Sequence, residues 1–231
     1  MTRIFTSPAA FAALTFIVYA AALGLYKKFK FFLLHPVLVS IAALIAILRL
    51  AGLSYEEYSR GGIFITSLLS PAVVALGISL YREFGKIRKE AGAIVITTIF
   101  GSLVGIISAV VPALLLGSPP QVIISLAPKS VTTPIAMEIA GKLGGVPSLA
   151  AVIVILTGVF GAVTGPAVLG LLHITQESAF GLAMGFAAHG VGTARAFEKA
   201  DAAGAFAGLG LCLNGLATSV LTPVIISLIP G

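Results

Sequence analysis

Charged residues are scarce in this chain. Asp, Glu, Lys and Arg make up 10% of its 231 residues, whereas a soluble domain carries about a quarter. Hydrophobic residues make up 58%, and the mean hydropathy is +1.13. So few polar groups cannot cover a water-facing surface, and an ordinary soluble domain is therefore excluded.

Cysteine and the usual catalytic motifs are also lacking. The single cysteine, Cys212, excludes an internal disulfide. The sequence contains no His/Cys cluster with metal-ligand spacing, no glycine-rich phosphate loop after a strand and no nucleophile elbow. Glu138 and Glu177 form no evident catalytic pair, because nothing in the sequence brings them together. We therefore expect no enzyme activity, no metal and no cofactor.

Long uncharged runs are what the chain has instead. Each reaches or exceeds the roughly 18–20 residues needed to cross a bilayer, and none alternates as barrel strands do. The runs are Ile4–Tyr26, Phe31–Leu48, Ala91–Pro128, Leu143–Gln176 and Ala202–Gly231. We predict an all-α polytopic membrane protein, one domain over residues 1–231, with about eight transmembrane or broken helices. The expected spans are 8–26, 31–49, 62–80, 91–116, 128–143, 146–172, 178–195 and 203–229.

Basic residues predict the orientation of these spans. The two richest clusters, residues 27–30 and 82–89, lie two spans apart and can share one side, which the positive-inside rule makes cytoplasmic. Both chain ends then face outward. We attribute the net charge of +6 to these basic residues of cytoplasmic loops, which set the topology, so no nucleic-acid partner is expected. Because no signal-peptide cleavage site or transit segment is evident, the predicted location is a bacterial or archaeal plasma (inner) membrane, as a multi-pass protein.

Two segments of the chain resemble each other. "SPAVVALGISL" (70–80) is similar to "GPAVLGLLHIT" (165–175), and the match aligns Pro71 with Pro166. In the predicted topology the matched spans have opposite orientation, which is the pattern of an inverted-topology repeat, here 31–116 and 128–201. In such proteins the ligand site lies near the membrane midplane, at helices interrupted by proline or glycine. Pro71 and Pro166 are therefore expected to be helix breaks.

The first polar island in the apolar sequence is "LAPKSVTTPIAMEI" (126–139). Pro128 and Pro134 should break the helix there, leaving amide groups that are tolerated at membrane depth only inside protein or beside a wet cavity. Three hydroxyl side chains are placed to cap those groups: Ser130, Thr132 and Thr133. Lys129 together with a helix N-terminus would form an anion site. Alternatively, Lys129 ends a loop and extends to the membrane interface.

The second polar island is "AAHGVGTARAFEKAD" (187–201). Its candidate substrate-binding residues are His189, Gly190, Gly192, Thr193 and Arg195. Ionisable groups in such segments usually face a cavity, but His189 is equally explained by packing against a carbonyl, and Arg195 by an end anchor paired with Glu198. Asn214 is an interhelical hydrogen-bonding group or a ligand.

Four ordered motifs resemble the LrgB/CidB family, which includes YohK-like proteins and the plastidal glycolate/glycerate translocator. They are "LLSPAVVALGISLYREF", "APKSVTTPIAMEIAGKLGG", "GAVTGPAVLGLLHI" and "AAHGVGTARAFE". The family's Pro-Lys-Ser-x-Thr-x-Pro motif falls on residues 128–134 here, and its His-Gly-x-Gly-Thr-Ala motif falls on 189–194. The resemblance covers roughly Pro36 to Pro230, and both islands are kept without gaps.

The resemblance implies two classes of function. One is a carrier of a small monocarboxylate such as glycolate, glycerate or pyruvate, working by alternating access. In that case Lys129 or Arg195 meets the carboxylate, and hydroxyls of Ser130, Thr132 or Thr193 meet another oxygen. The other is an antiholin- or holin-like protein that regulates murein hydrolase export and cell lysis. A broken-helix site favours the carrier. The expected partners are the bilayer, a small LrgA/CidA-like membrane protein and a second copy in a homodimer.

Overall fold

The structure is a computed structural model that describes residues 7–29, 31 and 34–228. Within these residues the chain is helical and contains no strand, as expected for an all-α protein. Four helices are long and apolar enough to cross a membrane: α2 (Pro8–Phe29), α7 (Ala91–Leu115), α10 (Pro147–Leu171) and α12 (Asp201–Ser227). The protein is therefore a polytopic helical membrane protein, which confirms the predicted class. Its chain forms two compact units, Met1–Ala75 and Leu76–Gly231.

The first unit contains α2, α3 (Pro36–Leu50) and α4 (Tyr55–Ser67). A capping box starts α4: the Ser54 hydroxyl accepts from the Glu57 N–H, and the Glu57 carboxylate accepts from the Ser54 N–H. These bonds to the charged form hold the pKa of Glu57 below its ordinary value. Gly61 lets α4 approach α2, because a Cβ there would overlap Phe11.

The predicted span 62–80 is two helices in the structure. One ends at Ser67, and α5 (Leu69–Arg82) follows the intervening Leu68. Pro71 therefore lies in the first turn of α5, where proline is well tolerated, and it does not interrupt a span as predicted. A short basic helix, α6 (Phe84–Lys89), leads into α7.

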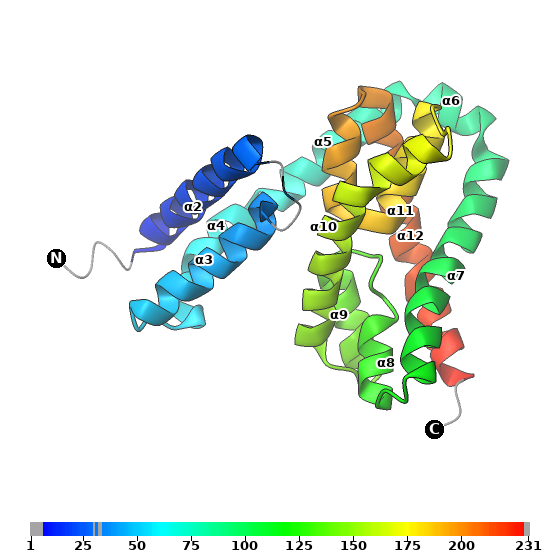
Figure 1. Cartoon of the computed structure of the whole chain (residues 1–231). Helices are drawn as coiled ribbons and strands as arrows, with labels where there is room; N and C mark the ends of the chain where they lie inside the picture. The colour runs from blue at the N-terminus through cyan, green and yellow to red at the C-terminus, as the bar shows by residue number, and fades with distance from the viewer. Residues whose placement is uncertain (1–6, 30, 32–33, 229–231) are drawn as a thin grey trace. The chain divides into compact units, whose positions relative to one another are not determined.

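The second unit contains a first hairpin, residues 120–142, which enters the unit and turns back (Figure 1). Its limbs are α8 (Pro120–Leu126) and α9 (Thr133–Lys142), joined by the non-helical residues 127–132. The return is visible in the contact between its two ends. The backbone N–H of Val146 donates to Ser125 Oγ at 2.7 Å, although 21 residues of straight helix would separate them by about 30 Å. We call residues 127–132 the first tip.

A second hairpin is formed by α11 (Glu177–Phe197), which folds back on itself at Ala188 and His189. Gly192 packs against the Met184 carbonyl, which would lie about 12 Å away along a straight helix. Near its ends, Lys199 Nζ lies 3.9 Å from the centre of the Phe180 ring. The second tip is therefore residues 188–189, between limbs 177–187 and 190–197.

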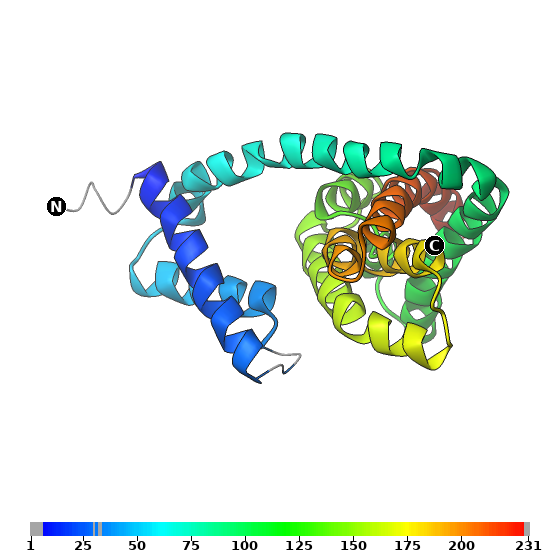
Figure 2. The ribbon, with the colours of Figure 1, turned by 90° about the horizontal axis from the view of Figure 1, so that it is seen from above.

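The two hairpins enter the unit from opposite ends. The first packs against the C-terminal half of α7, where Ile106, Val110 and Ala113 cluster with Ile123 and Ala127. The second packs at the other end, where Ile94 of α7 clusters with Leu182 and Phe206. Seen from above, α11 and α12 lie at the centre of this unit, with α7 and α10 around them (Figure 2).

These hairpins correct two of the predicted spans. Segments 128–143 and 178–195 do not cross the unit, because each belongs to a hairpin that returns to the end it came from. As a result α10 begins at the end where α7 finishes, and it runs opposite to the predicted direction (Figure 1). The helix also continues through Pro166 to Leu171, so the predicted break at that proline is not present.

An inverted pair is present inside the second unit. One long helix and one hairpin, residues 91–142, are followed by another long helix and hairpin, residues 147–197, entering from the opposite end. Its boundaries differ from those of the predicted repeat, 31–116 and 128–201. The alignment of Pro71 with Pro166 compares α5, where the two units join, with α10, and it stays a prediction.

Candidate functional site

A buried amide links the first tip to the second hairpin, next to its tip. Asn214, at the middle of α12 and 1% exposed, donates through Nδ2 to the Ser130 carbonyl at 2.8 Å and to the Phe186 carbonyl at 3.4 Å. Its Oδ1 accepts from Ser102 of α7 at 2.7 Å and from Thr218 at 3.2 Å. Both donors and the acceptor oxygen are thus engaged within the protein. Asn214 positions the tips and is not free to bind a ligand.

Lys129 lies in the first tip, beside the middle of α7. Its Nζ donates to the Gly105 carbonyl at 2.9 Å and to Ser108 Oγ at 3.0 Å. Gly105 allows this approach, because a Cβ there would lie 3.2 Å from Ser130 Oγ. Among the described residues no carboxylate pairs with Lys129. The ammonium group is therefore at mid-depth with neutral partners only, and the alternative that it extends to the interface does not fit this placement.

The second limb of the first hairpin begins at this tip. Thr132 is the N-cap of α9 but its side chain makes no capping bond, so the capping predicted for it is absent. Thr133 opens the helix and Pro134 follows, as is common at a helix start. Both threonines are partly exposed. The N-terminus of α9, which is the positive end of its helix dipole, therefore lies at mid-depth and has no side-chain cap.

His189 makes the turn in the second tip. Its backbone has φ 40° and ψ −127°, a region that favours glycine and costs a non-glycine residue about 1–3 kcal/mol. The ring is buried, and Nε2 bonds to the Val154 carbonyl of α10 at 2.9 Å, with Nε2 as the donor because a carbonyl only accepts. The packing alternative for His189 is thus the one that the structure shows.

The residues after His189 begin the second limb. Gly190 is exposed, with open space where a Cβ would stand, whereas Gly192 is buried between the limbs. Thr193 is 4% exposed and donates to the His189 carbonyl at 2.9 Å. This limb, like α9, presents its N-terminal end at mid-depth.

Arg195 does not join this group. Its side chain is half-exposed and forms an ion pair with Glu198. It borders a small cavity with Pro166, Phe180 and Lys199, at the end of the unit where the second hairpin enters. Lys129 and Arg195, the two residues expected to meet a substrate carboxylate, are therefore not brought together, and the end-anchor alternative describes Arg195.

Several residues of the site were not predicted. Ser102, Gly105 and Ser108 of α7 and Val154 of α10 supply partners for the two tips. They lie in uniformly apolar helices, and small-xxx-small spacing at 101–105 indicated close packing only. Within the described residues, no three His, Cys, Asp or Glu side chains come close enough to hold a metal ion.

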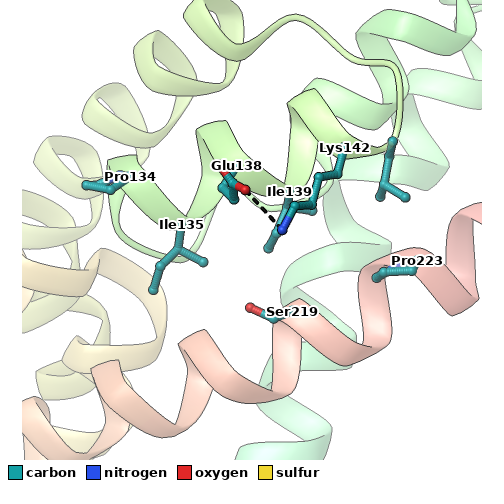
Figure 3. Close-up of a pocket in the computed structure, with 8 residues that line it drawn as sticks. Pro134, Ile135, Glu138, Ile139, Lys142, Ser219 and Pro223 are labelled. Atoms are coloured by element: carbon teal, nitrogen blue, oxygen red, sulfur yellow. Dashed lines mark ion pairs between the residues drawn. The ribbon is translucent and has the colours of Figure 1, made fainter.

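Two cavities extend along the hairpins from opposite ends. One of about 530 Å³ lies between α9 and α12, from Pro134 and Ile135 near the first tip to Lys142 and Leu143 (Figure 3). The other, of about 660 Å³, lies between α7 and α11, from Glu90 and Gln176 to Val104 and Phe186. Phe186 is the residue whose carbonyl Asn214 holds.

Comparison with known proteins supports the sequence-based resemblance. The family described as the LrgB-like family matches residues 15–228. The uncharacterized protein YwbG of Bacillus subtilis is 39% identical over 93% of this chain and 95% of its own length. The holin-like protein CidB of Staphylococcus aureus (strain Mu50) is 32% identical over 93% of this chain and 94% of its own length. No solved structure matches the chain.

Proposed function

The chain belongs to the LrgB-like family, and we propose that it is a carrier of small monocarboxylates of the glycolate, glycerate and pyruvate class. The observation that carries the proposal is the meeting of two oppositely inserted hairpins at mid-depth. Transporters built on inverted repeats bind their substrates at such a place, at the ends of interrupted helices. No enzyme chemistry is proposed.

Charge is the second support. Two half-helices, α9 and the limb 190–197, begin at the tips, and helix N-termini favour anions. Lys129 adds a full positive charge with only a carbonyl and a hydroxyl as partners. A cation at membrane depth is costly without a counter-ion. A substrate carboxylate at the first tip would supply that counter-ion, with the hydroxyls of Thr132 or Thr133 beside it.

Alternating access would use the two cavities. Each approaches the linked tips from one end of the unit, so that movement of one hairpin at a time would open one path while the other stays closed. Asn214 would hold the hairpins in the closed arrangement, because it bonds to the first tip at Ser130 and to the second hairpin at Phe186, just before its tip. Opening either hairpin would break one of its bonds.

The second candidate is a holin- or antiholin-like role, favoured by the name of the relatives CidB. A lesion-forming protein needs no pair of linked tips, which is why the carrier is preferred. In either role the protein would sit in a bacterial inner membrane, as a homodimer or with a small LrgA/CidA-like partner.

Reconstitution separates the two candidates. Purified protein in liposomes should take up labelled glycolate or pyruvate saturably, and excess unlabelled acid should compete. An encapsulated neutral dye of similar size should stay inside. Leakage of that dye at the rate of acid movement would support a lesion and contradict the carrier.

A further inference from the structure

The cavity between α9 and α12 contains one charged pair. Glu138 and Lys142 lie one turn apart on α9, and their side chains meet at 3.0 Å (Figure 3). The rest of the lining is apolar or hydroxyl: Pro134, Ile135, Ile139, Leu143, Ser219 and Pro223. Both charged side chains are largely open, at 67% exposed for Glu138 and 74% for Lys142. The same two residues also border the space between α9 and Pro147, so the pair is open on both sides.

The position of this pair follows from the first hairpin. Lys142 ends α9 beside the loop to α10, at the mouth of the cavity, and Pro134 lies eight residues further in. That distance is about 12 Å of helix. Glu138 lies halfway between them. A solute moving along α9 to the first tip therefore passes both charges before it reaches Thr133.

We propose that Lys142 is an outer binding station for the carboxylate substrate, at which the incoming anion displaces Glu138. This rests on the proposed carrier function and adds a site that is separate from the tips. The displacement is easy because an exposed ion pair one turn apart on a helix is weak. Glu138 then acts as a competing internal anion, which keeps Lys142 from retaining the substrate.

The station faces one side of the membrane. The basic residues at the other end of the second unit include Lys86, Arg88, Lys89, Arg195 and Lys199. The positive-inside rule makes that end cytoplasmic, so the cavity with Lys142 opens outward. Binding at Lys142 should therefore affect the uptake of substrate from outside, in addition to any effect on binding at the tips.

Two charge-neutralising substitutions test the station, because they should act in opposite directions. Lys142→Gln removes the binding charge and should raise the half-saturation concentration for external glycolate about three- to tenfold. Glu138→Gln removes the competitor and should lower it about two- to fivefold. A pair that only stabilised α9 would be lost in both variants, and both would then change in the same direction. Equal or absent shifts in the two variants would overturn the proposal.

A matched control lies at the opposite end of the unit. Glu198 also pairs with a basic residue one turn away, Arg195, but it does not border the α9–α12 cavity. Glu198→Gln should leave the half-saturation concentration for external substrate unchanged. A decrease equal to that of Glu138→Gln would show a general effect of net charge and count against a local station.

Chemical footprinting gives a readout that does not depend on transport. In detergent-purified protein, millimolar glycolate should slow modification of Lys142 by an amine-reactive reagent, measured by mass spectrometry, and leave Lys199 unaffected. Protection should be lost when glycolate is replaced by its uncharged amide. Protection without saturable uptake would keep the station and refute the carrier, whereas saturable uptake without protection would refute the station alone.

Discussion

The side-chain amide of Asn214 donates to the backbone carbonyl of Ser130 across 2.8 Å, although 84 positions separate them in the chain. The same amide reaches the Phe186 carbonyl, just before the second tip. One residue of the last helix therefore fixes the distance between two hairpins that enter from opposite ends. Neither hairpin can withdraw without leaving a buried carbonyl or the Asn214 amide unpaired.

Replacing Asn214 by aspartate should damage both folding and uptake. The substitution keeps the shape and the acceptor for Ser102 and Thr218, but it removes both donors and places one carboxylate oxygen against two carbonyls. Each buried carbonyl left unpaired costs about 1–3 kcal/mol. Thermal unfolding in detergent should show a marked loss of stability, and the maximal uptake rate should fall.

Thr218→Val is the matched control for Asn214→Asp, because it removes only one hydrogen bond, of 3.2 Å, from the acceptor side. It should cost about 1 kcal/mol and retain uptake. Equal stability and uptake in Asn214→Asp and Thr218→Val would contradict the role given to the donors.

Gly190 and Gly192, the two glycines on either side of Val191, should respond differently to substitution by alanine. Gly192→Ala places a methyl group against Met184 and Ala188, so the limbs of the second hairpin must separate. Overpacking of this kind costs about 1–3 kcal/mol. Gly190→Ala adds its methyl group in open space and should keep native stability. Thermal unfolding of the two variants checks this, and equal melting temperatures would contradict the hairpin packing.

Alanine substitutions of Lys129 and Arg195 should have different effects on uptake. Lys129→Ala removes the ammonium group at the first tip and should reduce uptake at low substrate by about ten- to hundredfold, the effect of losing a charge-assisted hydrogen bond. Arg195→Ala removes a half-exposed anchor and should retain most uptake. Initial rates of uptake by both variants at matched expression check this, and an equally severe loss in Arg195→Ala would contradict the anchor role given to Arg195. Full uptake by Lys129→Ala would place the substrate site elsewhere.

Helix positions were predicted well from sequence because apolar length and proline placement are local properties. The break around Pro128 and the starts of α7, α10 and α12 all lie within about two residues of the predicted bounds. The direction of α10 was predicted wrongly, because segment 128–143 was expected to cross the membrane. A hydropathy profile gives the position and length of apolar segments. It does not show whether a segment crosses the membrane or turns back, because a hairpin of two half-helices can have the same composition as one crossing. The signal that was available is that segment 128–143 is shorter than the roughly 20 residues a crossing requires.

The tip residues were recognised for their chemistry, but their partners were not. Lys129, His189 and Asn214 are rare polar groups in apolar surroundings, so composition alone marks them. Their partners are largely backbone carbonyls, those of Gly105, Val154 and Ser130, which every residue type carries. No pattern of side chains can predict such contacts, and the turn at His189 occupies a position where glycine would be expected.

The first hairpin makes a prediction about membrane sidedness that differs from the one drawn from hydropathy. Leu116, after α7, and Ser148, at the start of α10, flank the hairpin and should face the same side of the membrane, while Leu172, beyond the end of α10, should face the other. If segment 128–143 crossed the membrane, Leu116 and Leu172 would instead share a side and Ser148 would lie opposite. Single cysteines at these positions in a Cys212→Ser background distinguish the two. An impermeant thiol reagent applied to intact cells should label positions 116 and 148 but not 172, and all three after permeabilisation. Labelling of positions 116 and 172 without 148 would refute the hairpin.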